Sequence, residues 1–445
     1  MKIRTVTDFL NKELKEYAFD ILENRCIPSC IDSFKPSQRK VVYVAEKIWK
    51  TGNEKPMKVF QLTGRTAMEA YYHHGNQSMD ALITNMGQKF KNNLPILDGI
   101  GQYGTLRSTT AGAPRYISTK LHPNFRLVFK DFELLENQIE EGVIVEPKMY
   151  LPILPVVIIN SSISIGMGYA SNILGRNPKD VVQACIDHLN GKKVKELKPW
   201  FAEFSGEWVR DKENPNKWVA KGIYEIDKTN VHITELPPDW TFEKYESYLD
   251  DLIEKKIIRD YDNNSSSGVD YLLRFKKEIL DDLLAKDKLE STLKINSSFS
   301  ENLTTLDEKG KLKIFSSVEE IVEYFVDFRL GYYQKRKDYL VEKYGKELKE
   351  LCFKAKFIKS IIDKKLVVNN VPKATIVTWL EENKFEKMNG DYNYLLNLPI
   401  YNLTKERYED LMSRAKVKKE QLEETKSLVP KEMYLDDLTE LKKKL

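Results

Sequence analysis

One stretch near the C-terminus restricts the fold more than any other part of the chain. Residues 318–363 contain no proline, and apolar side chains recur there at intervals of three, four and seven. This spacing predicts a single helix of about 40 residues and about 60 Å. A second helix with one apolar face is predicted to start after Thr404 and to stop at Pro430. The pair predicts an antiparallel coiled coil, with a small tip at about residues 364–403.

The N-terminal third has a different pattern. A helix is predicted over residues 5–24, and further helical segments end near residues 49, 72 and 90. Turns that contain glycine and proline join these segments, which is typical of a helix-turn-helix unit. Residues 94–120 follow as loop and short strand, in the place of a wing. The sequence therefore predicts a winged-helix domain here.

The middle of the chain favours β-structure. Residues 151–160 are strongly apolar and β-branched, which predicts a buried strand. Short strands are predicted near residues 206–209, 217–220 and 231–236, after a helix over 180–189. The fold class expected for the whole chain is therefore α+β and multidomain.

The overall charge limits the kinds of partner. The chain carries 71 Lys and Arg against 67 Asp and Glu, a net charge of +4. This balance excludes a uniformly basic coat, so a nucleic-acid surface must come from local clustering. No apolar run is long enough to span a membrane. Cys26 and Cys30 lie close together, but no second pair completes a zinc site, so buried thiols are expected.

The dipeptide Arg115-Tyr116 follows a glycine-flanked loop. A phenol, with a pKa of about 10, is a poor nucleophile unless something stabilises its anion. A neighbouring arginine supplies a permanent charge and planar donors that fit a phosphate. Attack of the tyrosine on a phosphodiester is one coherent chemistry for the pair. An ordinary structural tyrosine is the alternative, since the chain has 23 of them.

Cations are expected on one side of the winged helix. Arg39 and Lys40 fall in the first turns of a helix, and Lys58 lies close to the next one. Together they would form a platform for DNA phosphates. A solvated helix face is the alternative for each of them.

A series of motifs occurs in a fixed order along the chain. They are residues 32–41 (Asp-Ser-Phe-Lys-Pro-Ser-Gln-Arg-Lys-Val), 72–78 (Tyr-His-His-Gly-Asn-Gln-Ser), 101–105 (Gly-Gln-Tyr-Gly-Thr), 114–116 (Pro-Arg-Tyr), 150–155 (Tyr-Leu-Pro-Ile-Leu-Pro), 165–168 (Ile-Gly-Met-Gly) and 394–398 (Tyr-Leu-Leu-Asn-Leu). In this order the chain resembles the DNA breakage-and-reunion half of type II topoisomerases. The paired histidines and the Pro-Arg-Tyr triplet favour the eukaryotic and T4-like phage branch over bacterial gyrase.

The resemblance implies a set of functional residues. Tyr116 would be the nucleophile that joins a DNA 5′ phosphate, and Arg115 would stabilise the transition state. Ile165 would wedge between base pairs of a bent duplex. The remaining residues implied to contact DNA are Arg39, Lys40, Lys58, His74, Gln102 and Ser78.

The resemblance also implies a domain plan. We expect an N-terminal helical arm (1–27), a winged-helix DNA-binding and cleavage domain (28–135), an α/β tower domain (136–320), a coiled coil with its helical tip domain (321–430) and a C-terminal helical tail (431–445). A separate gene for this half is the arrangement of T4-like phages, which would put the protein in the cytoplasm of a bacterial host. An excised piece of a fused enzyme is the alternative.

Partners and cofactors follow from the same resemblance. Asp281-Asp282 and Asp436-Asp437 are interpreted as solvated helix faces, so no metal site is expected in this chain. An ATPase/TOPRIM large subunit would then supply the Mg²⁺ ligands and bind ATP. Double-stranded DNA and a second copy of the chain are the other partners, the copy bound through the coiled-coil C-gate and the winged-helix domain.

The expected activity is the relaxation and decatenation of DNA through a transient double-strand break. Two hypotheses of other classes stay open from the sequence. The first is a non-catalytic DNA-bending protein on the same scaffold, which needs no tyrosine. The second is a purely structural coiled-coil protein, which explains only residues 318–430.

Overall fold

The computed structural model describes residues 5–266 and 268–445, so the predicted N-terminal arm begins outside the described residues. These residues divide into two compact units. The first comprises the described residues up to Arg329 together with Asp437–Leu445, and the second comprises Leu330–Asp436. Helices and small antiparallel sheets occur together, which confirms the predicted α+β class.

A helical arm opens the first unit. It is a continuous run of α- and π-helical turns, made of α1 (Val6–Asp8), η1 (Phe9–Leu14), α2 (Lys15–Ile21) and η2 (Leu22–Cys26). Thr5 caps it, because its hydroxyl accepts from the Asp8 backbone N–H at 3.1 Å. Side chains on the outer turns, such as Phe9 and Tyr17, are exposed, whereas Leu22 at the last turn is buried.

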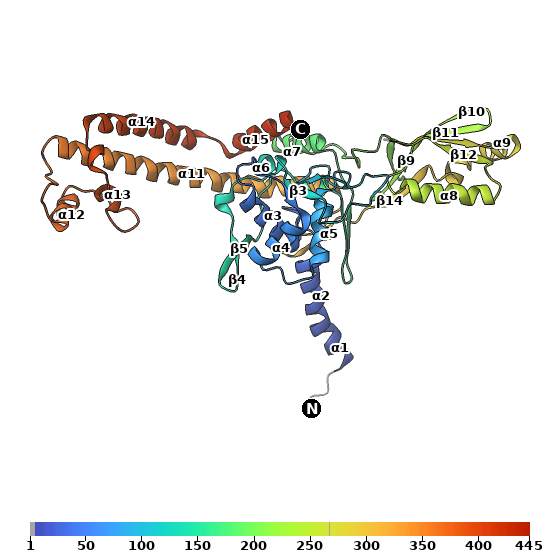
Figure 1. The fold of residues 1–445 in the computed structure, drawn as a ribbon, viewed down its shortest axis with the longest axis horizontal. Coiled ribbons are helices and arrows are strands. Elements are labelled where there is room, and N and C mark those ends of the chain that lie inside the picture. The colour runs from blue at the N-terminus through green and yellow to red at the C-terminus, as the bar shows by residue number, and fades with distance from the viewer. Residues whose placement is uncertain (1–4, 267) are drawn as a thin grey trace. The chain divides into compact units, whose positions relative to one another are not determined.

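The winged helix follows (Figure 1). Its elements are α3 (Pro36–Ile48), β1 (Met57–Lys58), α4 (Val59–Glu69), α5 (Asn76–Gly87), β2 (Leu97–Ile100) and β3 (Ser118–Leu121). The strands form an antiparallel sheet in the order β1-β3-β2. Pro36 is the first residue of α3, where its missing N–H costs nothing, and Gln38 accepts from the Lys35 N–H at 2.9 Å.

An aromatic cluster joins the winged helix to the segment that follows it. Phe125 of α6 (Asn124–Val128) stacks on Phe129, and both rings pack edge-on against Tyr150. Phe129 also stacks on Phe34. The turn η3 (Phe132–Leu134) and a hairpin of β4 (Asn137–Glu140) and β5 (Val143–Pro147) lie between Phe129 and Tyr150 in sequence.

The prediction of a strand over residues 151–160 was wrong. The segment is buried, as its composition indicates, but it is irregular apart from the 3-10 turn η4 (Val156–Ile158). Pro152 and Pro155 supply no backbone N–H donor, which explains why a sheet ladder does not form there.

The rest of the first unit is built from small antiparallel sheets. A hairpin of β6 (Ser162–Ile165) and β7 (Ala170–Ile173) precedes α7 (Pro178–Leu189). One sheet has the order β14-β9-β8 and comprises β8 (Glu207–Arg210), β9 (Lys217–Lys221) and β14 (Asn296–Ser300). A further hairpin pairs β15 (Thr304–Leu306) with β16 (Leu312–Ile314).

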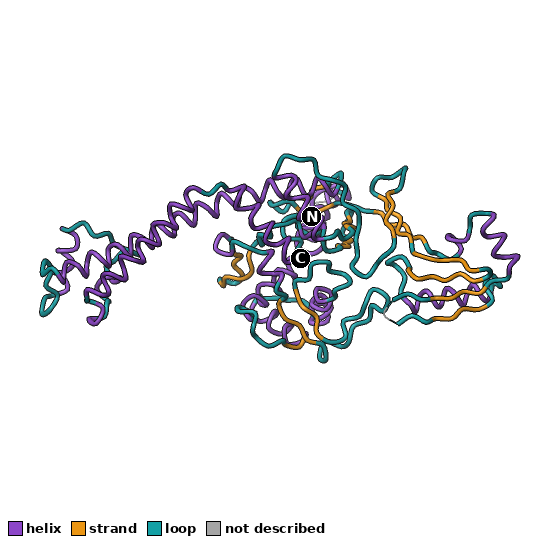
Figure 2. Tube along the Cα trace, turned by 90° about the horizontal axis from the view of Figure 1, so that it is seen from above, coloured by secondary structure: helices purple, strands orange, loops and turns teal. Residues whose placement is uncertain are grey.

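A four-stranded sheet carries the largest core of this region. Its order is β10-β11-β13-β12, from β10 (Ile223–Asp227), β11 (Asn230–Glu235), β12 (Asp260–Asn263) and β13 (Tyr271–Arg274). The helices that accompany it are α8 (Phe242–Glu254), α9 (Lys277–Ala285) and α10 (Leu289–Thr292). Figure 2 shows the strands side by side. Val231, Ile233 and Tyr271 of the sheet pack against Tyr245 and Leu249 of α8. The strands predicted near 206–209, 217–220 and 231–236 are confirmed.

The second unit is helical. It contains most of α11 (Val318–Ile362), then α12 (Lys373–Glu382), α13 (Asn393–Leu396), η5 (Ile400–Asn402), α14 (Lys405–Ser427) and the start of α15 (Pro430–Lys444). Ala355 and Ile358 of α11 pack with Leu411 of α14, and Lys418 pairs with Glu347 at 2.8 Å. The predicted long helix and its return helix are therefore confirmed. No helix in the described ranges is both long and apolar enough to cross a membrane.

Candidate active site

Tyr116 lies at the end of the loop that joins β2 to β3. Its side chain is 69% exposed, whereas the next residue, Ile117, is 2% exposed. The Tyr116 N–H donates to the Ala113 carbonyl at 2.8 Å, and its own carbonyl accepts from Lys58 Nζ at 2.7 Å. The backbone of this residue is therefore held on both sides while its phenol faces solvent.

Tyr103 is a buried residue that supports the loop between β2 and β3. Its hydroxyl donates to the Ser118 carbonyl at 3.0 Å, and burial raises the pKa of this phenol to about 12. Its ring fills the space beside Gly87 and Gly99, where a Cβ would lie 2.6 Å and 2.7 Å from ring atoms. The motif of residues 101–105 therefore supplies a structural tyrosine as well as the turn that leads toward Tyr116.

Glycines give this loop its shape. Gly101 and Gly104 have φ values of 105° and 79°, a region that residues with a side chain rarely adopt. The Gly112 N–H donates to the Gln102 carbonyl at 2.8 Å, which closes the loop, while the Gln102 side chain is exposed. A Cβ on Gly112 would lie 3.1 Å from Ile117, the buried residue that follows Tyr116. The glycine therefore lets the loop close against Ile117.

Arg115 lies directly beside the exposed phenol. Its guanidinium carbon is 5.0 Å from the centroid of the Tyr116 ring. The side chain is exposed and forms no ion pair with any described carboxylate. Arginine and tyrosine are thus brought together, and the cation remains available to an anion that reaches the phenol.

Lys58 connects this loop to the start of α4. Its ammonium donates to the Tyr116 carbonyl, while its backbone N–H donates to Gln61 Oε1 at 3.0 Å. Lys58 also pairs with Ser118 across β1 and β3. The predicted DNA-binding lysine therefore also positions the loop of the candidate nucleophile.

The paired histidines occupy the turn before α5, and both side chains are exposed. The His74 ring makes an edge-to-face contact with Tyr72 at 5.3 Å. His73 Nε2 lies 3.5 Å from Glu140 Oε1. In the described part of the chain, no hydrogen bond joins either histidine to Tyr116. Ser78, in the first turn of α5, is exposed as well.

Arg39 is held within the protein. Its guanidinium donates to both oxygens of the fully buried Asp32, at 2.8 Å and 3.1 Å. Burial alone would lower the pKa of Arg39, but the Asp32 carboxylate outweighs it and raises the pKa above the ordinary value. Asp32 also accepts from the backbone N–H groups of Phe34 and Tyr150. This pair therefore ties the start of α3 to a segment more than a hundred residues away.

Lys40 is held in a similar way. Its ammonium lies 2.8 Å from Glu140 and 3.0 Å from Glu146, and it donates to the Ala70 carbonyl at 2.6 Å. Glu140 and Glu146 come from β4 and β5. The DNA-binding roles predicted for Arg39 and Lys40 are thus not visible in the contacts that these side chains make, and they stay predictions.

Ile165 ends the β6 strand and is 82% exposed. Ile163, two residues earlier on the same face of the strand, is also exposed, as are Met167 and Tyr169 at the turn. Large apolar side chains gathered on one hairpin tip are unusual on a protein surface unless they meet a partner.

A cavity of about 750 Å³ lies between the winged helix and the β6–β7 hairpin, within the first unit. Ser78 and Ile163 line it, together with Lys35 and Lys91. Burial lowers the pKa of both lysines. Sequence reasoning missed these lysines, although Lys35 stands in the same motif as Arg39 and directly precedes Pro36.

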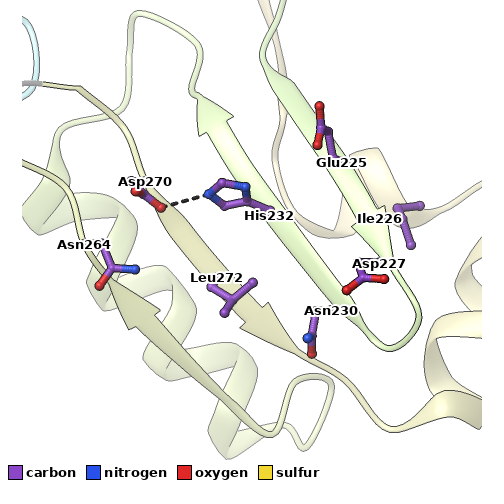
Figure 3. A pocket seen from close by; sticks show the side chains of 8 residues that line it. All are labelled: Glu225, Ile226, Asp227, Asn230, His232, Asn264, Asp270 and Leu272. Atoms are coloured by element: carbon purple, nitrogen blue, oxygen red, sulfur yellow. Dashed lines mark hydrogen bonds and ion pairs between the residues drawn. The ribbon is translucent and has the colours of Figure 1, made fainter.

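A second cavity, of about 400 Å³, lies on the solvent face of the four-stranded sheet (Figure 3). Half of its polar lining residues are acidic, namely Glu225, Asp227 and Asp270, and His232 Nε2 lies 2.9 Å from Asp270. Carboxylates repel phosphate, so the acidic side chains here do not favour binding of a DNA backbone.

Acidic side chains are the candidate magnesium ligands in the part of the chain that the structure describes. The described residues contain no group of three or more His, Cys, Asp or Glu that could hold a metal. Asp282, one of the acids considered from the sequence, instead pairs with Lys286 at 2.8 Å.

Comparison with known proteins decides the family. Residues 25–442 match the family model that describes the A subunits of DNA gyrase and topoisomerase IV. The chain belongs to this family of type II DNA topoisomerases. The resemblance inferred from the motifs is thereby confirmed.

Relatives fall into two groups by length. The chain is 33% identical over 99% of its length to the mitochondrial DNA topoisomerase 2 of Dictyostelium discoideum, but it spans only 35% of that protein. It is 32% identical to the DNA topoisomerase medium subunit of Enterobacteria phage T4, with 99% of both chains covered. The chain thus spans about a third of the Dictyostelium protein and almost the whole phage protein.

A solved structure is similar as well. The DNA-binding, cleavage and re-ligation domain of Plasmodium falciparum topoisomerase II matches 98% of this chain with a TM-score of 0.86 and 32% identity. This chain covers 65% of that structure.

Proposed function

We propose that this protein is the DNA cleavage and religation subunit of an ATP-dependent type II topoisomerase. The observation that carries the proposal is the exposed phenol of Tyr116 on a pinned backbone, beside the exposed guanidinium of Arg115. Family membership and the similarity to a cleavage and re-ligation domain support it.

The proposed reaction is a transesterification. Tyr116 Oη attacks a phosphodiester phosphorus, a 5′-phosphotyrosyl ester forms, and the bond to O3′ breaks. The phenol loses a proton and the O3′ leaving group gains one, so no net proton is consumed. Arg115 stabilises the charge that develops on the phosphoryl oxygens. The new ester keeps the bond energy, so religation is the reverse reaction and needs no further energy source.

DNA would lie over the winged helix. We assign phosphate and backbone contacts to Lys58, His74, Gln102 and Ser78, and we add Lys35 and Lys91 because they face the cavity beside Ser78. Burial lowers the pKa of both lysines, and phosphates bound there would favour their charged forms. Ile165 would insert at a base step and kink the duplex.

We infer that the metal and nucleotide chemistry belongs to a partner. An ATPase/TOPRIM large subunit would bring the Mg²⁺ ligands and bind ATP, because the described residues hold no metal cluster. The extra length of the fused relatives and the name of the phage relative, a medium subunit, favour this division. Two copies of the chain would form the DNA gate, and passage of a second duplex would relax and decatenate DNA.

The first prediction tests the nucleophile. We expect Tyr116→Phe, reconstituted with the partner subunit, Mg²⁺ and plasmid DNA, to give no covalent DNA–protein adduct in a denaturing precipitation assay. The phenol oxygen is the atom that forms the ester, so its removal should abolish adducts without changing the fold.

Tyr17→Phe is the matched control, because Tyr17 is similarly exposed (57%) but lies on α2 of the N-terminal arm. It should give adducts at the wild-type level. Adducts that survive in Tyr116→Phe would disprove the assignment. A bent but uncleaved complex formed by the wild-type protein would instead favour the DNA-bending alternative.

A further inference from the structure

The hairpin that carries Ile165 rests on the end of the N-terminal arm. Gly166 directly follows Ile165, and a Cβ at this position would lie 2.4 Å from Leu22 Cδ2 and 3.4 Å from Cys26 Cβ. Its φ lies outside the left-handed region, so space and not backbone conformation requires the glycine here. The last turn of the arm, η2, thus occupies the place where a side chain next to Ile165 would be.

Leu22 cannot easily move out of this place. It is buried in a small cluster with Ile27 and Leu306, against which Cys26 and Leu312 also pack. Glu23, the next residue of η2, approaches the turn between β15 and β16, where a Cβ on Gly310 would lie 2.6 Å from Glu23 Oε1. The end of the arm is therefore enclosed by the β15–β16 hairpin on one side and the β6–β7 hairpin on the other.

The turn after Ile165 lies at the surface. The Gly166 N–H donates to the Tyr169 carbonyl at 2.9 Å, which closes the turn. The side chains around it, Ile163, Ile165, Met167 and Tyr169, are all exposed. The contact between Leu22 and Gly166 is thus a buried apolar support next to a residue whose own side chain faces solvent.

We propose that Leu22 is a positioning residue for Ile165, which it supports through Gly166. The inference rests on the intercalating role proposed above for Ile165. A wedge that unstacks a base step works against the stacking energy of that step, so the backbone beneath the wedge needs a rigid support. In this chain the support is a leucine of the N-terminal arm, more than a hundred residues away from the hairpin in sequence.

The test uses the full chain with its ATPase/TOPRIM partner, in EDTA so that the duplex stays uncleaved. The duplex carries 2-aminopurine at each step near the cleavage site in turn, and donor and acceptor dyes at its ends. Unstacking is read from 2-aminopurine fluorescence and bending from energy transfer. We expect Gly166→Ala to lower the unstacked fraction about tenfold, because its methyl displaces the turn from Leu22.

The double variant Leu22→Ala, Gly166→Ala provides the decisive comparison. Removing the leucine side chain makes room for the added methyl, so unstacking should return to within about threefold of the wild-type value. A merely local folding defect at Gly166 would not be rescued by a change in the arm. Failure of the rescue would overturn the proposal.

Controls separate this inference from the proposed function. Gly345→Ala adds a methyl that meets nothing within 4 Å and should change neither signal. If Ile165→Ala leaves unstacking intact, the wedge role fails. If Ile165→Ala abolishes unstacking but Gly166→Ala does not reduce it, the support role fails. Should Gly166→Ala not fold, Leu22→Ala alone must lower unstacking severalfold with unchanged duplex affinity, and an unchanged signal would overturn the proposal.

Discussion

Burial distinguishes the tyrosines of the candidate site. Tyr103 and Tyr116 stand thirteen positions apart in one loop, yet the first is buried and its pKa is raised to about 12 by loss of solvent. The second is exposed and lies beside a guanidinium. A buried phenol with a raised pKa is a poor nucleophile, so only Tyr116 fits the proposed chemistry.

Arg115 is predicted to act on the transition state more than on binding. We expect Arg115→Ala to lower the cleavage rate by about 10²–10³, the usual cost of removing one charge-stabilising donor. Duplex affinity should change far less, because a single exposed cation contributes little to it. Single-turnover adduct formation and a filter-binding titration measure the two quantities.

Arg115→Lys is the informative control at this position. It keeps the charge but loses the planar donors, so its rate should fall between those of the wild type and the alanine variant. Equal losses in cleavage and in binding would mean that Arg115 only anchors DNA.

At the scale of elements, ion pairs between distant segments hold the winged helix together. Asp32 joins the start of α3 to Tyr150, while Glu140 and Glu146 bring the β4–β5 hairpin to Lys40. Arg39 and Lys40, for which DNA binding stays a prediction, thus also link segments of the scaffold.

Arg39 is predicted to be a stability residue. Arg39→Ala would leave Asp32 as a fully buried carboxylate without its ionic partner, which typically costs about 3–5 kcal/mol. The thermal unfolding temperature of the full chain should fall accordingly in a calorimetric scan. Arg65→Ala, which removes a partly exposed pair with Glu69 on α4, should cost less than about 1 kcal/mol.

A different result would assign Arg39 to DNA binding instead of stability. If the variant unfolds at the wild-type temperature but binds duplex more weakly and with a shallower salt dependence, Arg39 contacts phosphate as the sequence predicted.

Local patterns explain what the sequence predicted correctly at this scale. The heptad spacing of α11 and the alternation in β9 and β11 are properties of neighbouring residues, so the helix and the strands were predictable. Residues 151–160 were not, because Pro152 and Pro155 remove donors that a strand needs.

The site was predictable only in part. Tyr116 and Arg115 are adjacent in sequence, so their proximity needs no tertiary information. The partners of Lys40 lie about a hundred residues away in β4 and β5, and no local pattern indicates them. The support of Gly166 by Leu22 likewise depends on a contact between residues that are far apart in sequence.

For the whole molecule, the tip of the second unit is the surface that we propose for contact with a second copy of the chain. Ile400 and Tyr401, in η5 at the tip, are 87% and 78% exposed. Adjacent exposed apolar residues of this size on a compact helical tip are typical of an interface. The proposed homodimer would bury them across its symmetry axis.

Dimerisation is therefore predicted to depend on this tip. Ile400→Asp should weaken the dimer at least tenfold, because it would place a charge in an apolar interface. Sedimentation velocity across a dilution series measures the shift. Val417→Asp, an exposed position on α14, should leave the dimer intact. Dissociation by both variants, or by neither, would argue against an interface at the tip.

The pinned backbone of Tyr116 has a consequence for a broken duplex. A DNA end joined to this side chain could move only as far as the tyrosine side chain allows, because hydrogen bonds to Lys58 and Ala113 fix the main chain. This short linkage keeps the phosphate close to the released 3′ hydroxyl. The effective concentration of that hydroxyl is therefore far above the concentration of any competing acceptor. A change that frees the Tyr116 backbone, such as removal of the Lys58 ammonium, would favour separation of the DNA ends over religation.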